Sequence, residues 1–230
     1  MNLKEVKNIL KNSIVDMKTA GVAEIMRMER VSENRGKTLG IPTGFIDLDR
    51  MTSGLNNSDL IILAARPAMG KTAFALNLAL NAGKEKKNVL VFSLEMPVQQ
   101  LYQRLLSIES GISQNKLKNA YLEEQDWEKL TIATGILSNS NIFVADLPHT
   151  NVLEIRSYAR KMKSQNQLDL IIIDYLQLIN GSGRGGSEFN RQQEISDISR
   201  ALKGLARELD VPVIALSQLS RAVESRVDKR

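Results

Sequence analysis

Residues 60–72 read LIILAARPAMGKT, an aliphatic run followed by a turn of small residues and the tripeptide GKT. This order predicts a buried β-strand, a loop, and a helix that begins within the motif. The last three residues match the phosphate-binding pattern G-x-x-x-x-G-K-[ST], while alanine replaces glycine at its first position. Such a loop directs backbone N–H groups at a phosphate and presents it to the positive end of the helix. The stretch therefore predicts an α/β domain that binds a nucleotide.

Each position of this loop has its own task. Gly70 lets the backbone approach the phosphate closely, Lys71 supplies a compact charge to the β- and γ-phosphates, and the Thr72 hydroxyl can bind Mg²⁺. Ala65 suits the first position only if its φ is negative. We expect the nucleotide to be held by the loop and the first turn of the helix, which comprise Ala65, Arg66, Pro67, Ala68, Met69, Gly70, Lys71, Thr72 and Ala73.

Two carboxylates follow other predicted strands. Asp174 ends the aliphatic run 170–174, which is the form of the residue that organises Mg²⁺ through water in nucleotide hydrolases. Glu95 stands just past the strand 89–93, where a carboxylate can orient or deprotonate the attacking water. Because parallel strands share one carboxyl edge, we expect Lys71, Glu95 and Asp174 to converge. Taken singly, Glu95 also fits a solvated turn and Asp174 a helix cap.

Beyond residue 40 the chain alternates strands and helices. Gly83 is predicted to end the helix after the phosphate loop as a C-cap, and Asn151 with Glu154 resembles a capping box. The strands are continuously apolar, which predicts a parallel sheet covered by helices on both faces. Predicted strands are 60–64, 89–93, 142–145, 168–173 and 211–216; helices are 71–83, one that follows Pro97, 123–137, 151–164 and 188–209.

The first 38 residues differ from the rest. Apolar residues at helical spacing in 3–18 predict an amphipathic helix, and 19–38 reads as a tether with a helical middle at 22–30. The apolar stripe of the first helix either folds back on its own domain or docks on a neighbouring subunit. The predicted domains are residues 1–38, a linker helix with its tether, and residues 39–230, the α/β domain.

Composition narrows the function classes. The chain of 230 residues is 43% hydrophobic, enough for one α/β domain with an appendage but not for two catalytic domains. It has no cysteine, which excludes disulfides, thiolate zinc sites and cysteine nucleophiles. No apolar run approaches the length of a membrane span, about 18 residues, and the N-terminus does not have the pattern of a signal peptide. We therefore expect a cytoplasmic protein without a membrane partner. The formal charge of +5 is compatible with a nucleic-acid partner.

Several stretches resemble the DnaB family of replicative helicases. The similarity runs from about residue 40 to the last residue, and the N-terminal segment resembles the family's linker helix more loosely. The family commonly has alanine where Ala65 stands, so this residue is compatible with nucleotide binding. The stretches that carry the resemblance are GFIDLD (44–49), AARPAMGKT (64–72), FSLEM (92–96), IDYLQL (173–178), NRQQE (190–194) and ALSQLSR (215–221).

The resemblance implies a RecA-like P-loop fold and a homohexameric ring that uses ATP and Mg²⁺ to move along single-stranded DNA. By matching motif, Gln218 would sense the γ-phosphate, Glu95 would be the general base, and Arg104 would lie near the phosphate chemistry. Arg184, with Gly183 and Gly185, resembles a channel loop that contacts DNA phosphates without reading bases. A solvated helix face for Arg104 and a flexible surface loop for Arg184 stay open as alternatives.

The resemblance also implies partners and missing parts. The family works with a primase and a helicase loader, in a bacterial or phage-like cytoplasm beside the nucleoid. Its N-terminal domain, further strands, a second DNA-contacting loop and an arginine finger have no counterpart in this chain, so we expect a piece of a longer protein with low activity by itself. Two other functions stay open: a RecA-like ATPase that assembles on DNA without unwinding it, and a non-hydrolysing module that senses nucleotide.

Overall fold

The computed structural model describes residues 16–33, 38–165, 167–180 and 188–219. The chain divides into two compact units, Met1–Leu39 and Gly40–Arg230. None of the described helices is long and apolar enough to cross a membrane.

The first unit contains helix α2 (Met17–Glu33). The helix starts earlier than predicted, because the Asp16 carboxylate accepts hydrogen bonds from the backbone N–H and the hydroxyl of Thr19 at 2.9 and 2.6 Å. An ion pair between Glu24 and Arg27 adds support within the helix. The helical middle predicted at 22–30 lies within α2, but the helix already includes residue 19, so the tether does not begin there. The predicted helix 3–18 lies almost wholly outside the described residues.

The second unit is built on a parallel five-stranded sheet in the order β1-β7-β5-β2-β3. The neighbours are parallel throughout, so the predicted fold class is confirmed. A short ladder of β4 (Thr150–Asn151) and β6 (Ile179–Asn180) lies outside the main sheet. The strands of the main sheet are β1 (Leu60–Ala65), β2 (Val89–Ser93), β3 (Ile142–Asp146), β5 (Leu170–Asp174) and β7 (Val213–Gln218).

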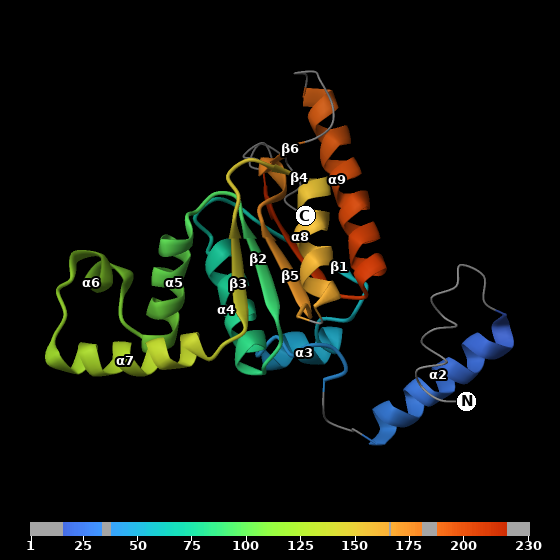
Figure 1. Ribbon diagram of the computed structural model, residues 1–230, viewed down its shortest axis with the longest axis horizontal. Coiled ribbons are helices and arrows are strands. Elements are labelled where there is room, and N and C mark those ends of the chain that lie inside the picture. Colours follow the sequence, from blue (N-terminus) through green and yellow to red (C-terminus); the bar gives the residue numbers. More distant parts are fainter. Residues whose placement is uncertain (1–15, 34–37, 166, 181–187, 220–230) are drawn as a thin grey trace, which may run out of the picture. The chain divides into compact units, whose positions relative to one another are not determined.

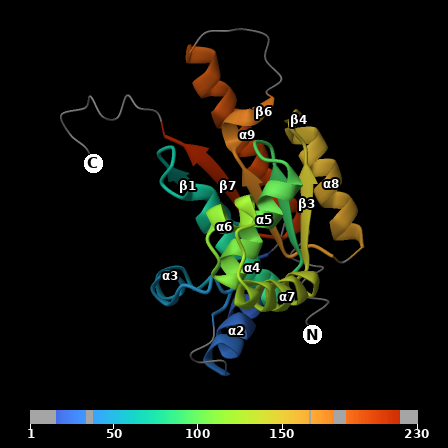
Figure 2. The same ribbon diagram turned by 90° about the vertical axis from the view of Figure 1, so that its left-hand side faces the viewer.

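Helices cover both faces of this sheet (Figures 1 and 2). Helices α4 (Lys71–Lys84) and α5 (Val98–Ser110) cover one face, and α8 (Val152–Ser164) and α9 (Glu188–Leu209) cover the other. Side chains of successive residues alternate between the two faces. On β2, for example, Leu90 packs in the cluster under α8 and α9, while Val89 packs in the cluster under α4. Apart from Phe92, the buried core residues of both described clusters are aliphatic, in line with the low aromatic content.

Gly83 does not end helix α4. The helix continues through Lys84, and Glu85 is its C-cap. A Cβ atom at Gly83 would stand 2.9 Å from Cγ1 of Ile142 on β3, which is closer than real contacts allow. The predicted C-cap is therefore wrong, and the glycine instead allows the helix to pack tightly on the strand.

The capping box at α8 is confirmed. The Asn151 side chain accepts hydrogen bonds from the N–H groups of Leu153 and Glu154 at 2.9 and 3.0 Å, and the Glu154 carboxylate accepts one from the Asn151 N–H. Short elements that have no strong periodicity were not predicted: α3 (Ile46–Thr52), α6 (Gln114–Asn119) and the 3₁₀ turn η1 (Leu176–Leu178). Helix α7 (Glu124–Ser138) matches the prediction closely.

Candidate nucleotide-binding site

The phosphate loop connects the end of β1 to the start of α4. Ala65 is still part of the extended strand and is absent from the positive-φ positions, as its side chain requires. The loop turns through two left-handed positions, Ala68 with φ 61° and Gly70 with φ 83°. Gly70 is the N-cap of α4, and no side chain caps the helix or places an acid in its first turn. The first N–H groups of α4 therefore stay available to an anion.

Three side chains meet beside this helix start. Nζ of Lys71 lies 3.6 Å from Oδ1 of Asp174, and the Thr72 hydroxyl donates a hydrogen bond of 2.7 Å to Oδ2 of the same carboxylate. The side chains of Lys71 and Asp174 are only 11% and 8% exposed, so solvent screens their attraction little. Lys71 also lies 4.2 Å from the centre of the Tyr175 ring, a cation–π distance.

The Asp174 carboxylate fits a metal site. Its Oδ1 atom is buried and has no hydrogen-bond partner among the described residues. A buried carboxylate oxygen normally needs such a partner, and Mg²⁺ prefers carboxylate, hydroxyl and phosphate oxygens. In the described part of the chain, no three acidic, histidine or cysteine side chains cluster to hold a metal by themselves. The pair of Thr72 and Asp174 thus suits an ion that shares its ligands with a phosphate.

Glu95 lies at the same edge of the sheet, on the exposed loop between β2 and α5. Hydrogen bonds hold this loop: the Leu94 N–H donates to the Asp174 carbonyl at 2.9 Å, the Val98 N–H donates to the Asp146 carboxylate at 3.0 Å, and the Ser93 hydroxyl donates to the Met96 carbonyl. Burial raises the pKa of the Tyr175 phenol, and the negative charges of Glu95 and Asp174 raise it further. The structure thus brings Glu95 near the cluster but shows no direct contact of its carboxylate with Lys71.

The other predicted residues divide into three groups. Gln218 ends β7 and pairs in register with Ala65, so it lies beside the start of the phosphate loop. Arg104 is half-buried on α5 and forms no hydrogen bond or ion pair with Lys71, Glu95 or Asp174. The third group lies outside the described residues and comprises Gly183, Arg184 and Gly185.

Sequence reasoning missed two residues of this site. Tyr175 lies under the ammonium of Lys71, and Gln177 bonds to the end of β7. Both belong to the stretch 173–178, where only Asp174 received a role. The available signal was their position directly after the acidic end of a buried strand, the edge at which such sheets bind ligands.

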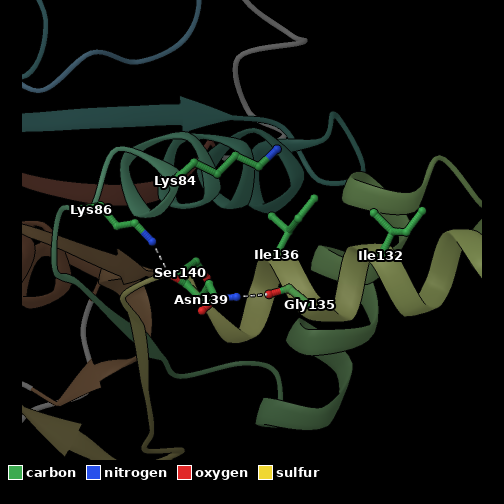
Figure 3. A pocket seen from close by; sticks show the side chains of 7 residues that line it. All are labelled: Lys84, Lys86, Ile132, Gly135, Ile136, Asn139 and Ser140. Atoms are coloured by element: carbon green, nitrogen blue, oxygen red, sulfur yellow. Dashed lines mark hydrogen bonds between the residues drawn. The ribbon is translucent and has the colours of Figure 1, made fainter.

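A separate pocket lies at the opposite end of α4 (Figure 3). It has a volume of about 310 Å³, and the Lys86 ammonium donates to the Asn139 carbonyl at its wall. Because α4 rises about 1.5 Å per residue, this pocket is roughly 20 Å from the phosphate loop and belongs to another surface. Its lining residues are Lys84, Lys86, Ile132, Gly135, Ile136, Asn139 and Ser140.

Comparisons with known proteins show the family to which the chain is similar. The family model described as the DnaB-like helicase C-terminal domain matches residues 40–230. The chain is 57% identical over 204 residues to the replicative DNA helicase DnaB of Geobacillus stearothermophilus, and 56% identical over 204 residues to the replicative DNA helicase DnaC of Bacillus subtilis (strain 168). Each match covers 88% of this chain but 44% of the relative, so the chain spans less than half the length of these relatives.

Solved structures show the same similarity. The ATPase domain of G40P superposes with a TM-score of 0.85 at 42% identity, over 94% of this chain and 76% of that one. A DnaB-like replicative helicase, described together with its interactions with primase, superposes with a TM-score of 0.83 at 41% identity, over 99% of this chain and 55% of that one.

Proposed function

Because the chain belongs to the family of DnaB-like helicase C-terminal domains, we propose that it is the ATP-hydrolysing motor domain of a replicative DNA helicase. The observation that carries the proposal is the contact of Lys71 and Thr72 with buried Asp174 at the uncapped start of α4. An ammonium, a helix N-terminus and a hydroxyl–carboxylate pair are the groups that a nucleoside triphosphate with Mg²⁺ requires.

Each side chain of the site has a proposed role. The loop and Lys71 would bind the β- and γ-phosphates, while Thr72 and Asp174 would hold Mg²⁺, the carboxylate partly through water. Bound Mg²⁺ would neutralise charge that develops on the phosphates. Glu95 would accept a proton from the attacking water, and Gln218 would contact the γ-phosphate.

The same proposal covers partners. Single-stranded DNA would contact Arg184, Gly183 and Gly185, and a ring of six subunits would enclose it. The primase contacts described for one solved relative support a primase partner, and family resemblance supports a helicase loader. Arg104 would add positive charge near the phosphates. We place the protein in a bacterial or phage-like cytoplasm beside the nucleoid, where its DNA substrate would be.

Replacing Glu95 with Gln tests the enzymatic part. In a protein that carries the family's complete motor domain, we expect Glu95→Gln to keep ATP–Mg²⁺ binding and to lose about 10²–10⁴-fold in turnover, the usual range for a general base. Unwinding of a forked duplex should fall with it. Glu128→Gln removes the same charge from an exposed position of α7 and should change neither property. Wild-type turnover in Glu95→Gln would rule out the proposed base.

The oligomeric state provides a second check. Arginine fingers from a neighbouring subunit contribute about 10³–10⁵ in rate in nucleotide hydrolases. We therefore expect this chain, as a monomer, to bind ATP–Mg²⁺ but to hydrolyse it slowly. Rapid hydrolysis by a monomer verified by light scattering would contradict the ring mechanism.

A further inference from the structure

Gln177 forms a clamp on the last residue of β7. Its Nε2 atom donates to the Gln218 carbonyl and to the Ser217 hydroxyl, both at 3.0 Å. Its Oε1 atom accepts from the Gln218 N–H at 3.2 Å. One side-chain amide thus pairs with both backbone groups of Gln218, as a neighbouring strand would.

The clamp forms where the pairing between β5 and β7 has ended. Strand β5 pairs with β7 only from Ile171 opposite Val213 to Ile173 opposite Ala215. On the other side of β7, the pairing with β1 continues to Ala65 opposite Gln218. In the described part of the chain, Gln177 therefore supplies the hydrogen bonds that hold the end of β7 on the side facing Asp174.

The position of Gln177 along the chain connects the clamp to the phosphate site. It lies in η1, three residues after Asp174 and just before β6. The Gln177 side chain thus links the segment that carries Asp174 to the backbone of Gln218, 41 residues further along the chain. A backbone held in this way fixes the origin of the Gln218 side chain, which is itself exposed.

We propose that Gln177 is a positioning residue that fixes the end of β7, so that Gln218 can distinguish a nucleoside triphosphate from a diphosphate. This inference rests on the proposed function, because it takes Gln218 as the group that contacts the γ-phosphate. In this proposal Gln177 acts through the backbone of Gln218 and not by contact with the nucleotide. The contacts of Lys71 and Thr72 are with Asp174 and do not involve Gln177, so we expect loss of the clamp to displace the end of β7 while the phosphate loop keeps its contacts.

The test compares affinities for a non-hydrolysable ATP analogue and for ADP, both with Mg²⁺, by titration calorimetry on this chain. Binding is measured rather than turnover, so slow hydrolysis does not interfere. Gln177→Met keeps the length of the side chain and removes the three hydrogen bonds to Ser217 and Gln218. Gln193→Met makes the same chemical change at an exposed position of α9 and is the control.

We expect the wild-type protein and Gln193→Met to bind the ATP analogue more tightly than ADP. Gln218→Ala should lower this preference roughly tenfold or more, since hydrogen bonds to charged groups are among the strong ones. Gln177→Met should lower it by a similar factor with ADP affinity unchanged, and the double variant should show no further loss, because both changes remove one interaction.

A pH series adds a readout that simple destabilisation would not move. Protonated glutamic acid has a donor and an acceptor that can replace the amide, whereas the carboxylate has acceptors only. Gln177→Glu should therefore regain preference for the ATP analogue as the pH falls, relative to the wild-type protein at each pH.

Two failures are distinguishable. If the wild-type protein binds neither nucleotide, the proposed function fails and this inference fails with it. If the wild-type protein prefers the ATP analogue and Gln177→Met shows the same preference, or loses ADP affinity equally, Gln177 does not position Gln218 and only this inference is overturned.

Discussion

Replacing Asp174 with Asn should remove most of the Mg²⁺ dependence of ATP binding. Asparagine keeps the size of the side chain and an oxygen that can accept the Thr72 hydroxyl, which now donates at 2.7 Å. It removes the negative charge 3.6 Å from Lys71 and the carboxylate that is proposed to support the metal. The substitution therefore changes the charge of the site with little change in its shape.

We expect Asp174→Asn to weaken ATP binding when Mg²⁺ is present and not to weaken it when Mg²⁺ is absent. Residues that support a bound metal typically contribute 10–100-fold to its affinity, or about 1.4–2.8 kcal/mol. Without Mg²⁺, the Asp174 carboxylate competes with the triphosphate for Lys71. The attraction between the carboxylate and the Lys71 ammonium at 3.6 Å has an upper bound of about 5 kcal/mol at an effective dielectric constant of 20. Metal-free ATP should thus bind Asp174→Asn at least as tightly as it binds the wild-type protein.

The assay is the ratio of ATP dissociation constants in chelator and in excess Mg²⁺. We expect this ratio to fall about 10–100-fold in Asp174→Asn. Asp169→Asn is the matched control, because Asp169 just precedes the same strand and accepts from the Asn88 N–H at 2.8 Å, at the opposite end from the site. An unchanged ratio in Asp174→Asn, or an equal fall in Asp169→Asn, would refute the metal role.

Three further predictions concern stability. In urea unfolding, Gly83→Ala should lower the free energy of unfolding by about 1 kcal/mol, because the cost of overpacking against β3 exceeds the gain in helix propensity. The matched change Gly135→Ala adds a methyl group in open space on α7 and should raise the free energy of unfolding by about 0.5–1 kcal/mol. Changes of the same sign in the two variants would contradict this reasoning. Asn151→Ala should cost about 1 kcal/mol through loss of the α8 cap, and no loss would refute the cap. Lys116 holds the pKa of Asp126 below its ordinary value, so this carboxylate's contribution is present above about pH 4 and is lost as pH falls through the lower folded pKa. In Asp126→Asn, the melting temperature should therefore fall less steeply with decreasing pH below about pH 4 than it does in the wild-type protein.

The local elements were predictable because their signals are contained in short stretches. The aliphatic run before the phosphate loop, the capping box at Asn151 and the helix 188–209 each depend on neighbours within one or two turns. Gly83 shows the limit of this reasoning. Its local pattern resembles a helix end, but the packing of Ile142 from a distant strand explains the glycine.

The sequence by itself determined that Lys71, Glu95 and Asp174 lie at one edge of a parallel sheet, because strands that run in the same direction end on the same side. Only the tertiary structure decided which atoms meet. Strand β7 lies between β1 and β5, although it is the last of the described strands along the chain, and this order brings Gln218 beside both the phosphate loop and Gln177. Contacts such as that of Thr72 with Asp174, 102 residues apart, depend on sheet order and packing rather than on local pattern.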